Sequence, residues 1–167
     1  GTPQFIGNRL RLDGNTVLMV AFNSNLYFGN GNFALSFKFE LDASSFGYFL
    51  NKAEGALSFR MSISLTNVYI LLWGTSGGFT FHTPVSLSAS TEYHLAVERY
   101  GDTITVYLNG LAINTETTNL PDLATSSGDL YIGAYKDSSP LYIPKGYIRQ
   151  LQIFRGAVYK GNFTPPT

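Results

Sequence analysis

The sequence predicts an all-β chain that folds as a two-sheet antiparallel sandwich. Short runs in which apolar and polar residues alternate dominate the chain, and helical periodicity is nearly absent. Turn signals separate these runs at intervals of about 8–12 residues, the spacing expected for a sandwich or barrel. No internal repeat, linker or change of composition interrupts the pattern, so we expect one domain covering residues 1–167.

The predicted strands begin near the N-terminus and continue to the C-terminal region. In chain order they cover residues 9–12, 17–21, 33–41, 47–50, 57–64, 68–73, 93–99, 103–108, 111–113, 129–134 and 146–154. In the run 33–41 every second residue is apolar, which predicts a long half-buried strand with Ala34, Ser36, Lys38 and Glu40 on its other face. The run 146–154 changes parity between Ile148 and Leu151, so a β-bulge near residues 149–150 is expected.

A hairpin at residues 103–113 is the sharpest local prediction. Asn109 and Gly110 separate two alternating runs, and this dipeptide suits the two positive φ angles of a type I′ turn. The run 93–99 and the turn at 100–102 precede it, so three strands form a meander.

Composition excludes several classes of function. Charged residues make up 13% of the chain, about half the usual share, while aromatic residues make up 15%. The 11 basic and 11 acidic residues cancel and form no basic run, so a nucleic-acid partner is not expected. There is no cysteine, and no apolar stretch approaches the roughly 20 residues of a membrane span, so no membrane insertion is expected. The first four residues do not resemble a signal peptide, and we expect a part of a longer protein.

Several blocks of sequence occur in the order found in a known family. They are residues 10–14, 26–37, 93–99, 106–110, 130–133 and 146–148. Together they resemble the concanavalin A-like lectin/glucanase (laminin-G-like) domains, which implies a jelly-roll sandwich that acts as a binding module. Two positions depart from that pattern: Glu92 replaces an aromatic residue, and Arg149-Gln150 replaces an acidic pair.

The C-terminal residues narrow the resemblance. Residues 153–167 resemble the endings of laminin-G-like modules in structural proteins of tailed phages. This implies a tail or fibre protein, located in the virion or on an extracellular surface. The partner would be a cell-surface glycan or protein receptor. A structural or trimerisation module in contact with other virion proteins, without its own ligand, is the alternative.

Catalysis is not expected. Glycoside hydrolysis needs two carboxyl groups about 5–10 Å apart, and glucanases of this fold use an E-x-D-x-E strand motif. The nearest match to this motif is the segment 40–44, in which Glu40 and Asp42 occupy the first two acidic positions. Ser44 occupies the position of the second Glu. His94 lies in the hairpin block, where we expect a hydrogen-bonded structural role.

Candidate ligand-binding residues lie in three regions, because sugars need aromatic faces and polar groups on positioned loops. Trp73, the only Trp, precedes a Gly-rich loop and is either a core residue or a ligand platform, and His82 lies beyond that loop. A polar loop at 51–55 and another loop at 135–139 supply the others. The full set is Tyr48, Asn51, Lys52, Glu54, Trp73, His82, Tyr135, Lys136 and Asp137.

Calcium is the only cofactor that the sequence suggests, as a structural ion. Such sites use loop carboxylates and carbonyl oxygens, for which the candidates are Asp13, Asn15, Asp102 and Asp137. No spacing among them matches an EF-hand.

Overall fold

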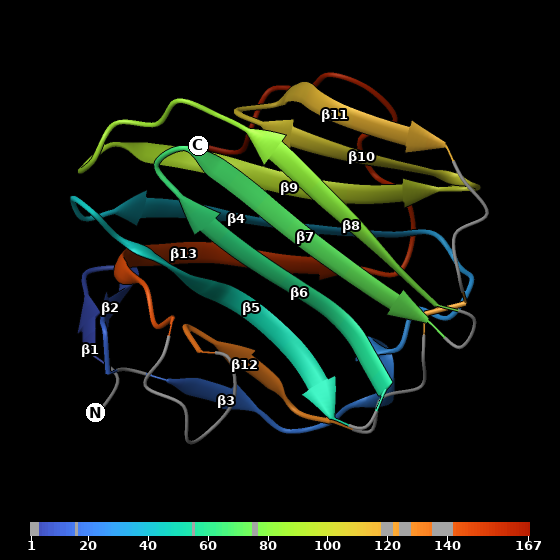
Figure 1. Ribbon diagram of the computed structural model, residues 1–167, viewed down its shortest axis with the longest axis horizontal. Coiled ribbons are helices and arrows are strands. Elements are labelled where there is room, and N and C mark those ends of the chain that lie inside the picture. Colours follow the sequence, from blue (N-terminus) through green and yellow to red (C-terminus); the bar gives the residue numbers. More distant parts are fainter. Residues whose placement is uncertain are drawn as a thin grey trace.

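The computed structural model of the chain describes residues 4–15, 17–54, 56–74, 77–117, 122–123, 128–134 and 142–167. It shows two antiparallel sheets packed face to face, which confirms the predicted sandwich (Figure 1). The described residues include a three-residue turn of 3-10 helix, η1 (Ser24–Leu26), and no helix among them has the length and hydropathy to cross a membrane.

One sheet has seven strands and the other has six. In spatial order, the first contains β1 (Gln4–Ile6), β2 (Arg9–Asp13), β13 (Lys145–Phe154), β4 (Phe33–Leu41), β9 (Glu92–Tyr100), β10 (Thr103–Leu108) and β11 (Leu111–Thr117). The second contains β3 (Leu18–Val20), β12 (Leu130–Ile132), β5 (Phe46–Glu54), β6 (Ala56–Ser64), β7 (Asn67–Gly74) and β8 (Gly77–Pro84).

The hydrophobic core fills the space between the sheets. In β4 the inward residues Phe33, Leu35, Phe37, Phe39 and Leu41 are each at most 1% exposed. Their counterparts on the six-stranded sheet are Phe49, Leu50, Phe59, Met61, Ile63, Val68, Ile70, Leu72 and Phe81. Burying a side chain of this size stabilises the fold by about 1.5–3 kcal/mol. The core therefore fixes which face of each strand points outward.

Two irregularities that the sequence predicts are present. Asn109 and Gly110 have φ values of 51° and 80°, as a type I′ turn requires. In β13 the register with β4 shifts between Arg149 and Gln152, and Gln150 has a φ of 52°, so the predicted bulge is confirmed.

Three local predictions were wrong, and one strand was missed. The segment 51–54 belongs to strand β5 rather than to a loop, and the residues from Gly77 onward form strand β8 rather than a Gly-rich loop. Strand β1 was not predicted. Strand β4 is not half-buried: Ala34, Ser36 and Lys38, on its outer face, are 0%, 1% and 8% exposed. Other parts of the chain must therefore cover that face.

Candidate functional site

The outer face of the six-stranded sheet carries rows of side chains that cross four strands. In one row, Tyr48 of β5 pairs with Ser62 of β6, Ser62 with Tyr69 of β7, and Tyr69 with His82 of β8. Because side chains alternate along a strand, each of these residues is fixed outward by core neighbours on either side. The backbone of the sheet, rather than a loop, sets their spacing.

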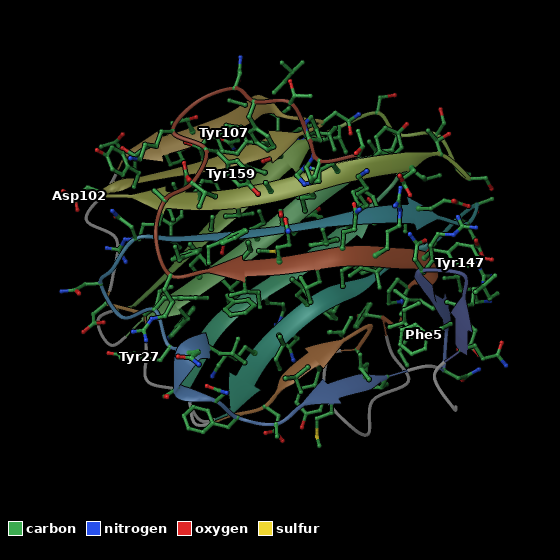
Figure 2. All side chains as sticks on the ribbon, turned by 180° about the vertical axis from the view of Figure 1, so that it is seen from behind. Phe5, Tyr27, Asp102, Tyr107, Tyr147 and Tyr159 are labelled. Carbon is green, nitrogen blue, oxygen red and sulfur yellow. The ribbon has the colours of Figure 1, made fainter. Side chains whose placement is uncertain are left out.

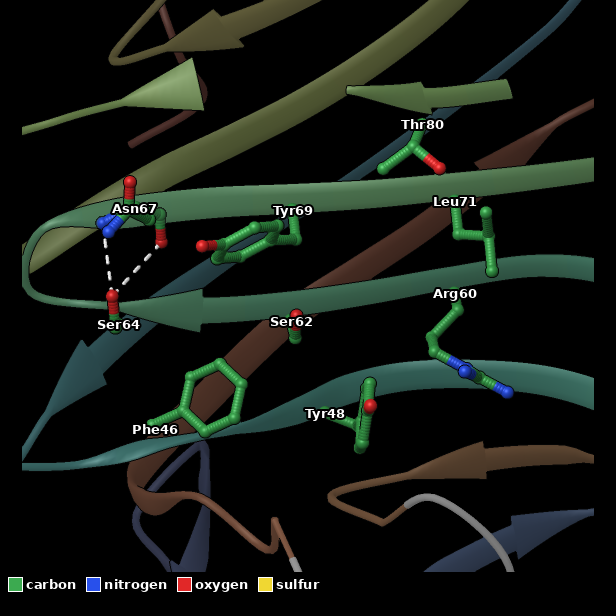
Figure 3. A pocket seen from close by; sticks show the side chains of 9 residues that line it. All are labelled: Phe46, Tyr48, Arg60, Ser62, Ser64, Asn67, Tyr69, Leu71 and Thr80. Atoms are coloured by element: carbon green, nitrogen blue, oxygen red, sulfur yellow. Dashed lines mark hydrogen bonds between the residues drawn. The ribbon is translucent and has the colours of Figure 1, made fainter. Parts of the chain in front are cut away.

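A pocket of about 390 Å³ lies on this face, and we call it the sheet-face pocket (Figure 3). Its lining residues are Phe46, Tyr48, Arg60, Ser62, Ser64, Asn67, Tyr69, Leu71 and Thr80. Serines on the central strand β6 leave room above the backbone, while Tyr48 and Tyr69 stand on the two flanking strands. These flanking strands are about 10 Å apart, since adjacent strands are separated by about 4.8 Å. The pocket is thus a shallow depression with an aromatic side chain on each side.

Ring contacts hold the aromatic side chains in place. Tyr142 makes edge-to-face contacts with Phe46 and Tyr48, at centroid distances of 5.6 and 5.7 Å. On the opposite side, Tyr69 stacks on His82 at 4.4 Å, and His82 Nε2 lies 2.7 Å from Asn67 Oδ1. Both aromatic sides of the pocket are therefore supported by neighbouring side chains.

Arg60 lies at one end of the pocket, away from Ser64 and Asn67 (Figure 3). Its Nε donates a hydrogen bond of 3.1 Å to Asn51 Oδ1, and its guanidinium carbon lies 5.1 Å from the centre of the Tyr48 ring. Asn51 is fully buried, so it restricts the orientation of the arginine. The pocket consequently has a neutral polar end and a cationic end.

Trp73 continues the aromatic surface along β7, four residues beyond Tyr69 and on the same face. It is 41% exposed, so of the two roles left open by the sequence, a surface platform fits and a core residue does not. A Cβ atom on the paired residue Gly78 would lie 2.0 Å from the indole ring. The ring thus lies over the glycine backbone while the side chain stays 41% exposed.

The structure brings together only some of the predicted ligand residues. Tyr48, Trp73 and His82 share the outer face of the six-stranded sheet. Asn51 and Lys52 are instead 0% and 1% exposed within β5. Glu54 belongs to β5 as well, but its side chain is outside the described part, as are all of Tyr135, Lys136 and Asp137.

Lys52 points into the molecule rather than toward a ligand. Its Nζ donates a hydrogen bond of 3.1 Å to the carbonyl oxygen of Gly128 and lies 5.4 Å from the centre of the Phe22 ring. Burial lowers the pKa of Lys52, against the opposing effect of the nearby Asp129 carboxylate. The expectation of a solvated polar loop failed here because a buried acceptor satisfies the lysine.

Several residues that line the pocket were missed by the sequence analysis. Arg60, Ser62 and Tyr69 were read only as parts of strands, and Phe46 lies just before the predicted strand 47–50. The available signal was their alternation with core residues such as Met61 and Ile70 on the same strands.

The described calcium candidates do not form one site. Asp13 pairs with Lys145 at one end of the seven-stranded sheet, whereas Asp102 follows Tyr100 in the turn at the other end (Figure 2). Asp13 Oδ1 accepts a hydrogen bond of 2.8 Å from the backbone N–H of Asn15. Among the residues that the structure describes, no three His, Cys, Asp or Glu side chains are grouped in a way that suits a metal ion.

The acidic residues considered for catalysis lie on or next to β4 of the seven-stranded sheet and are held by arginines of β2 in the same sheet. Glu40 Oε2 lies 3.0 Å from Arg9, and the Asp42 carboxylate binds Arg11 at 2.7 and 3.1 Å. The two residues that depart from the family pattern also pair with each other. Arg149 donates hydrogen bonds of 2.7 and 2.6 Å to the two oxygens of Glu92, which lowers the pKa of that carboxyl group.

Residues 155–167, which we call the C-terminal segment, run across the outer face of the seven-stranded sheet at β9 and β10 (Figure 2). The Glu98 carboxylate, 2% exposed, accepts hydrogen bonds from the backbone N–H groups of Val158, Tyr159 and Lys160. Phe163 stacks on Tyr159, with a centroid distance of 3.9 Å. This cover explains why the charged Glu98 of β9 is buried.

His94 lies beneath the same segment, with Phe163 edge-to-face at 5.6 Å. It is buried, as a structural residue should be, and burial lowers the pKa of its imidazole. The expected hydrogen bond is not seen at Nδ1, for which the described residues provide no partner.

Solved structures with similar folds agree with this architecture. The binding domain of Paraclostridial Mosquitocidal Protein 1 superposes with a TM-score of 0.76 at 15% identity, over 93% of this chain and 43% of that one. The receptor binding domain of botulinum neurotoxin C/D mosaic serotype superposes with a TM-score of 0.73 at 15% identity, over 95% of this chain and 42% of that one. Domain 4 of AbnA, an extracellular arabinanase from Geobacillus stearothermophilus, was solved in complex with arabinotriose. It superposes with a TM-score of 0.67 at 20% identity, over 94% of this chain and 75% of that one. The chain thus spans less than half the length of the two toxin domains.

Sequence comparison identifies the family. No curated protein matches the sequence. A laminin G-type family model, described as the Concanavalin A-like lectin/glucanases superfamily, matches residues 13–160 and so covers most of the chain. The chain belongs to the concanavalin A-like lectin/glucanase superfamily.

Proposed function

We propose that this domain is a non-catalytic binding module that holds a glycan in the sheet-face pocket. The observation that carries the proposal is the pocket itself, a depression of about 390 Å³ with Tyr48 and Tyr69 on either side, over which none of the described segments lies. A sugar ring presents C–H groups on its faces and hydroxyl groups around its edge. Aromatic side chains bind the former, and a small number of placed polar groups bind the latter.

The polar groups of the pocket fit this chemistry. Ser62, Ser64, Asn67 and Thr80 offer hydroxyl and amide groups that both donate and accept hydrogen bonds. No carboxyl group is among the described residues that line the pocket, so the acid and base of a glycosidase are not found there. Trp73 extends the surface beyond Leu71, which favours a ligand longer than one sugar unit.

The similar structures support binding as the general class of function. They are a binding domain, a receptor binding domain and an arabinanase domain in complex with arabinotriose. From the resemblance of residues 153–167, we further propose a phage tail fibre or a similar surface adhesin, in the virion or at an extracellular surface. The ligand would then be a glycan or glycosylated receptor on the target cell.

The test is binding of the fluorescently labelled domain to a glycan array and to intact bacterial cells, with and without calcium. We expect saturable binding that Tyr48→Ala and Trp73→Ala each weaken on the order of tenfold, the effect of losing one aromatic contact surface. Tyr100→Ala is the matched control, because Tyr100 is a 55% exposed tyrosine of the seven-stranded sheet. Binding that all three folded variants retain would exclude the sheet-face pocket.

A structural role in virion assembly or trimerisation is the second candidate. It is favoured by exposed apolar side chains on the edge strands β1 and β3, where Phe5, Ile6 and Met19 are 67%, 48% and 54% exposed. Apolar surface of this kind is typical of contacts between proteins. Light scattering over a wide range of protein concentration distinguishes this structural role from the glycan-binding role. A monomer throughout, with glycan binding, excludes self-association as the main role.

A further inference from the structure

His82 of β8 lies behind the side of the sheet-face pocket that Tyr69 and Asn67 form. It pairs with Tyr69 across the two strands, and its imidazole stacks on the Tyr69 ring at a centroid distance of 4.4 Å and an interplanar angle of 10°. His82 Nε2 also lies 2.7 Å from Asn67 Oδ1. Tyr69 and Asn67 line the pocket, whereas His82 does not belong to the described residues that line it. One exposed imidazole thus contacts two pocket residues from outside the pocket.

The contacts of Asn67 fix which way its side-chain amide faces. Its Nδ2 donates a hydrogen bond of 2.9 Å to Thr66 Oγ1, so its Oδ1 faces His82 as an acceptor. The imidazole must then carry a proton on Nε2, because a carbonyl oxygen cannot donate. The backbone N–H of Asn67 donates a separate hydrogen bond of 3.0 Å to Ser64 Oγ (Figure 3). Loss of the imidazole would therefore leave this backbone contact in place and remove one of the two hydrogen bonds that orient the amide.

Contacts of this kind affect affinity because they exist before a ligand binds. A side chain that a ligand must immobilise lowers the affinity, since its lost freedom offsets part of the contact energy. The stacked imidazole restricts the Tyr69 ring, and the hydrogen bond restricts the Asn67 amide. Both pocket residues are therefore already ordered in the unliganded domain.

We infer that His82 is a positioning residue of the sheet-face pocket, which orients the Tyr69 ring and the Asn67 amide for a glycan without contacting the glycan. The inference rests on the proposed glycan-binding function and adds a residue that sets affinity from outside the pocket. Two parts of the imidazole have different partners: the ring face contacts Tyr69, and Nε2 contacts Asn67. Substitutions can remove these two contacts separately.

The experiment measures apparent dissociation constants of the labelled domain on an array of hexose and pentose oligosaccharides two to six units long. His82→Ala removes both contacts, so we expect affinity to fall about fivefold to tenfold for each glycan that the wild type binds. His82→Phe keeps a ring against Tyr69 but has no donor, and His82→Gln keeps an N–H donor but has no ring. Each of these two variants should retain part of the affinity that His82→Ala loses.

A double-mutant cycle with Asn67 separates positioning from direct contact. Asn67→Ala removes the amide that His82 orients, so adding His82→Phe to it should cause no further loss of affinity. A histidine that bound the glycan itself would lose the same factor in both backgrounds. Thr117→Ala is the control, because it removes an exposed cross-strand hydrogen bond of 3.1 Å with Thr103 on the other sheet and should not change affinity.

The possible outcomes separate the two proposals. Equal affinities of the wild type and His82→Ala, or independent effects of His82→Phe and Asn67→Ala, overturn the inference about His82. If Tyr48→Ala still weakens binding in either case, the proposed function stands. An absence of wild-type binding to every arrayed glycan and to intact bacterial cells overturns both. Circular dichroism checks that each variant is folded.

Discussion

The outer faces of the two sheets differ in what covers them. On the seven-stranded sheet the C-terminal segment lies across β9 and β10, and the polar residues Ser36, Glu98 and His94 are at most 3% exposed. On the six-stranded sheet no described segment lies across the outer face of β6 and β7, and Trp73 is 41% exposed. The same sandwich thus uses one outer face to complete its own structure and leaves the other without a covering segment among the described residues.

The comparison shows that aromatic and polar residues on an outer face do not by themselves mark a ligand site. Tyr107, Tyr159 and Phe163 are as aromatic as the pocket residues, but their rings contact each other. Tyr48 and Tyr69, by contrast, are separated by a serine and leave space for another molecule.

The largest expected effect comes from removing the attachment of the C-terminal segment. Glu98→Ala leaves three backbone N–H groups without their acceptor, so we expect the free energy of unfolding to fall by about 3 kcal/mol. Urea denaturation measures this change. Glu116→Ala, an exposed glutamate on β11, is the control and should cost less than about 0.5 kcal/mol. Equal losses in both variants would contradict the proposed attachment.

A second way to disturb the covered face is Gly110→Ala. The φ of Gly110 is +80°, and an added Cβ would lie 1.9 Å from the carbonyl oxygen of Phe163. We expect a loss of about 2 kcal/mol, of which about 1 kcal/mol is backbone strain. Gly101→Ala is the control for backbone strain without a steric clash. Gly101 has a φ of +59°, and no atom lies within 4 Å of its added Cβ. If urea denaturation gives both variants the same stability, the contact with Phe163 contributes nothing.

On the uncovered face, Gly78→Ala should reduce ligand binding more than stability. The added methyl group would meet the Trp73 ring at 2.0 Å and displace it from the sheet. We expect affinity for the identified glycan to fall about fivefold to tenfold by titration, somewhat less than for removal of the ring. Gly77→Ala is the neighbouring control, since nothing lies within 4 Å of its Cβ, although its φ of +135° adds strain. Unchanged affinity in Gly78→Ala would mean that the Trp73 ring is not a contact surface.

The smallest expected effect is that of the Glu92–Arg149 ion pair. The pKa of Glu92 is lowered in the folded state, so its contribution is present above its unfolded pKa and is lost as the pH falls through the folded value. Since the pair is partly exposed, Glu92→Gln should cost only about 0.5 kcal/mol at pH 7. The difference between wild type and variant, measured by urea denaturation, should shrink on acidification and disappear below the lowered folded pKa of Glu92. A difference that grows on acidification would contradict this assignment.

Sequence reasoning predicted what depends on local alternation and turn chemistry. The alternating run of β4, the Asn109-Gly110 turn and the bulge in β13 are properties of neighbouring residues. Strand β8 was missed because two consecutive glycines, Gly77 and Gly78, suggest a loop. Gly78 instead lies within the strand, where the absence of a side chain leaves room for the Trp73 ring. Lys52 was assigned to a loop because its acceptor, Gly128, is distant in the sequence.

The same contrast between local sequence signals and long-range contacts applies to the candidate site. Tyr48, Trp73 and His82 were selected one by one, but their common face follows from strand pairing that no single segment reveals. The cover over β9 and β10 depends on contacts between residues about 60 positions apart, such as Glu98 and Val158. Such long-range contacts have no signature in a hydrophobic pattern.

The row formed by Tyr48, Ser62, Tyr69 and His82 has a consequence for how the protein can change. Because each member alternates with core residues, its side chain can be exchanged without repacking the interior. Because strand hydrogen bonds already hold the backbone, a new ligand would not have to order a loop on binding. The six-stranded face is therefore suited to rapid diversification in nature and to library-based engineering of new specificities on an unaltered scaffold.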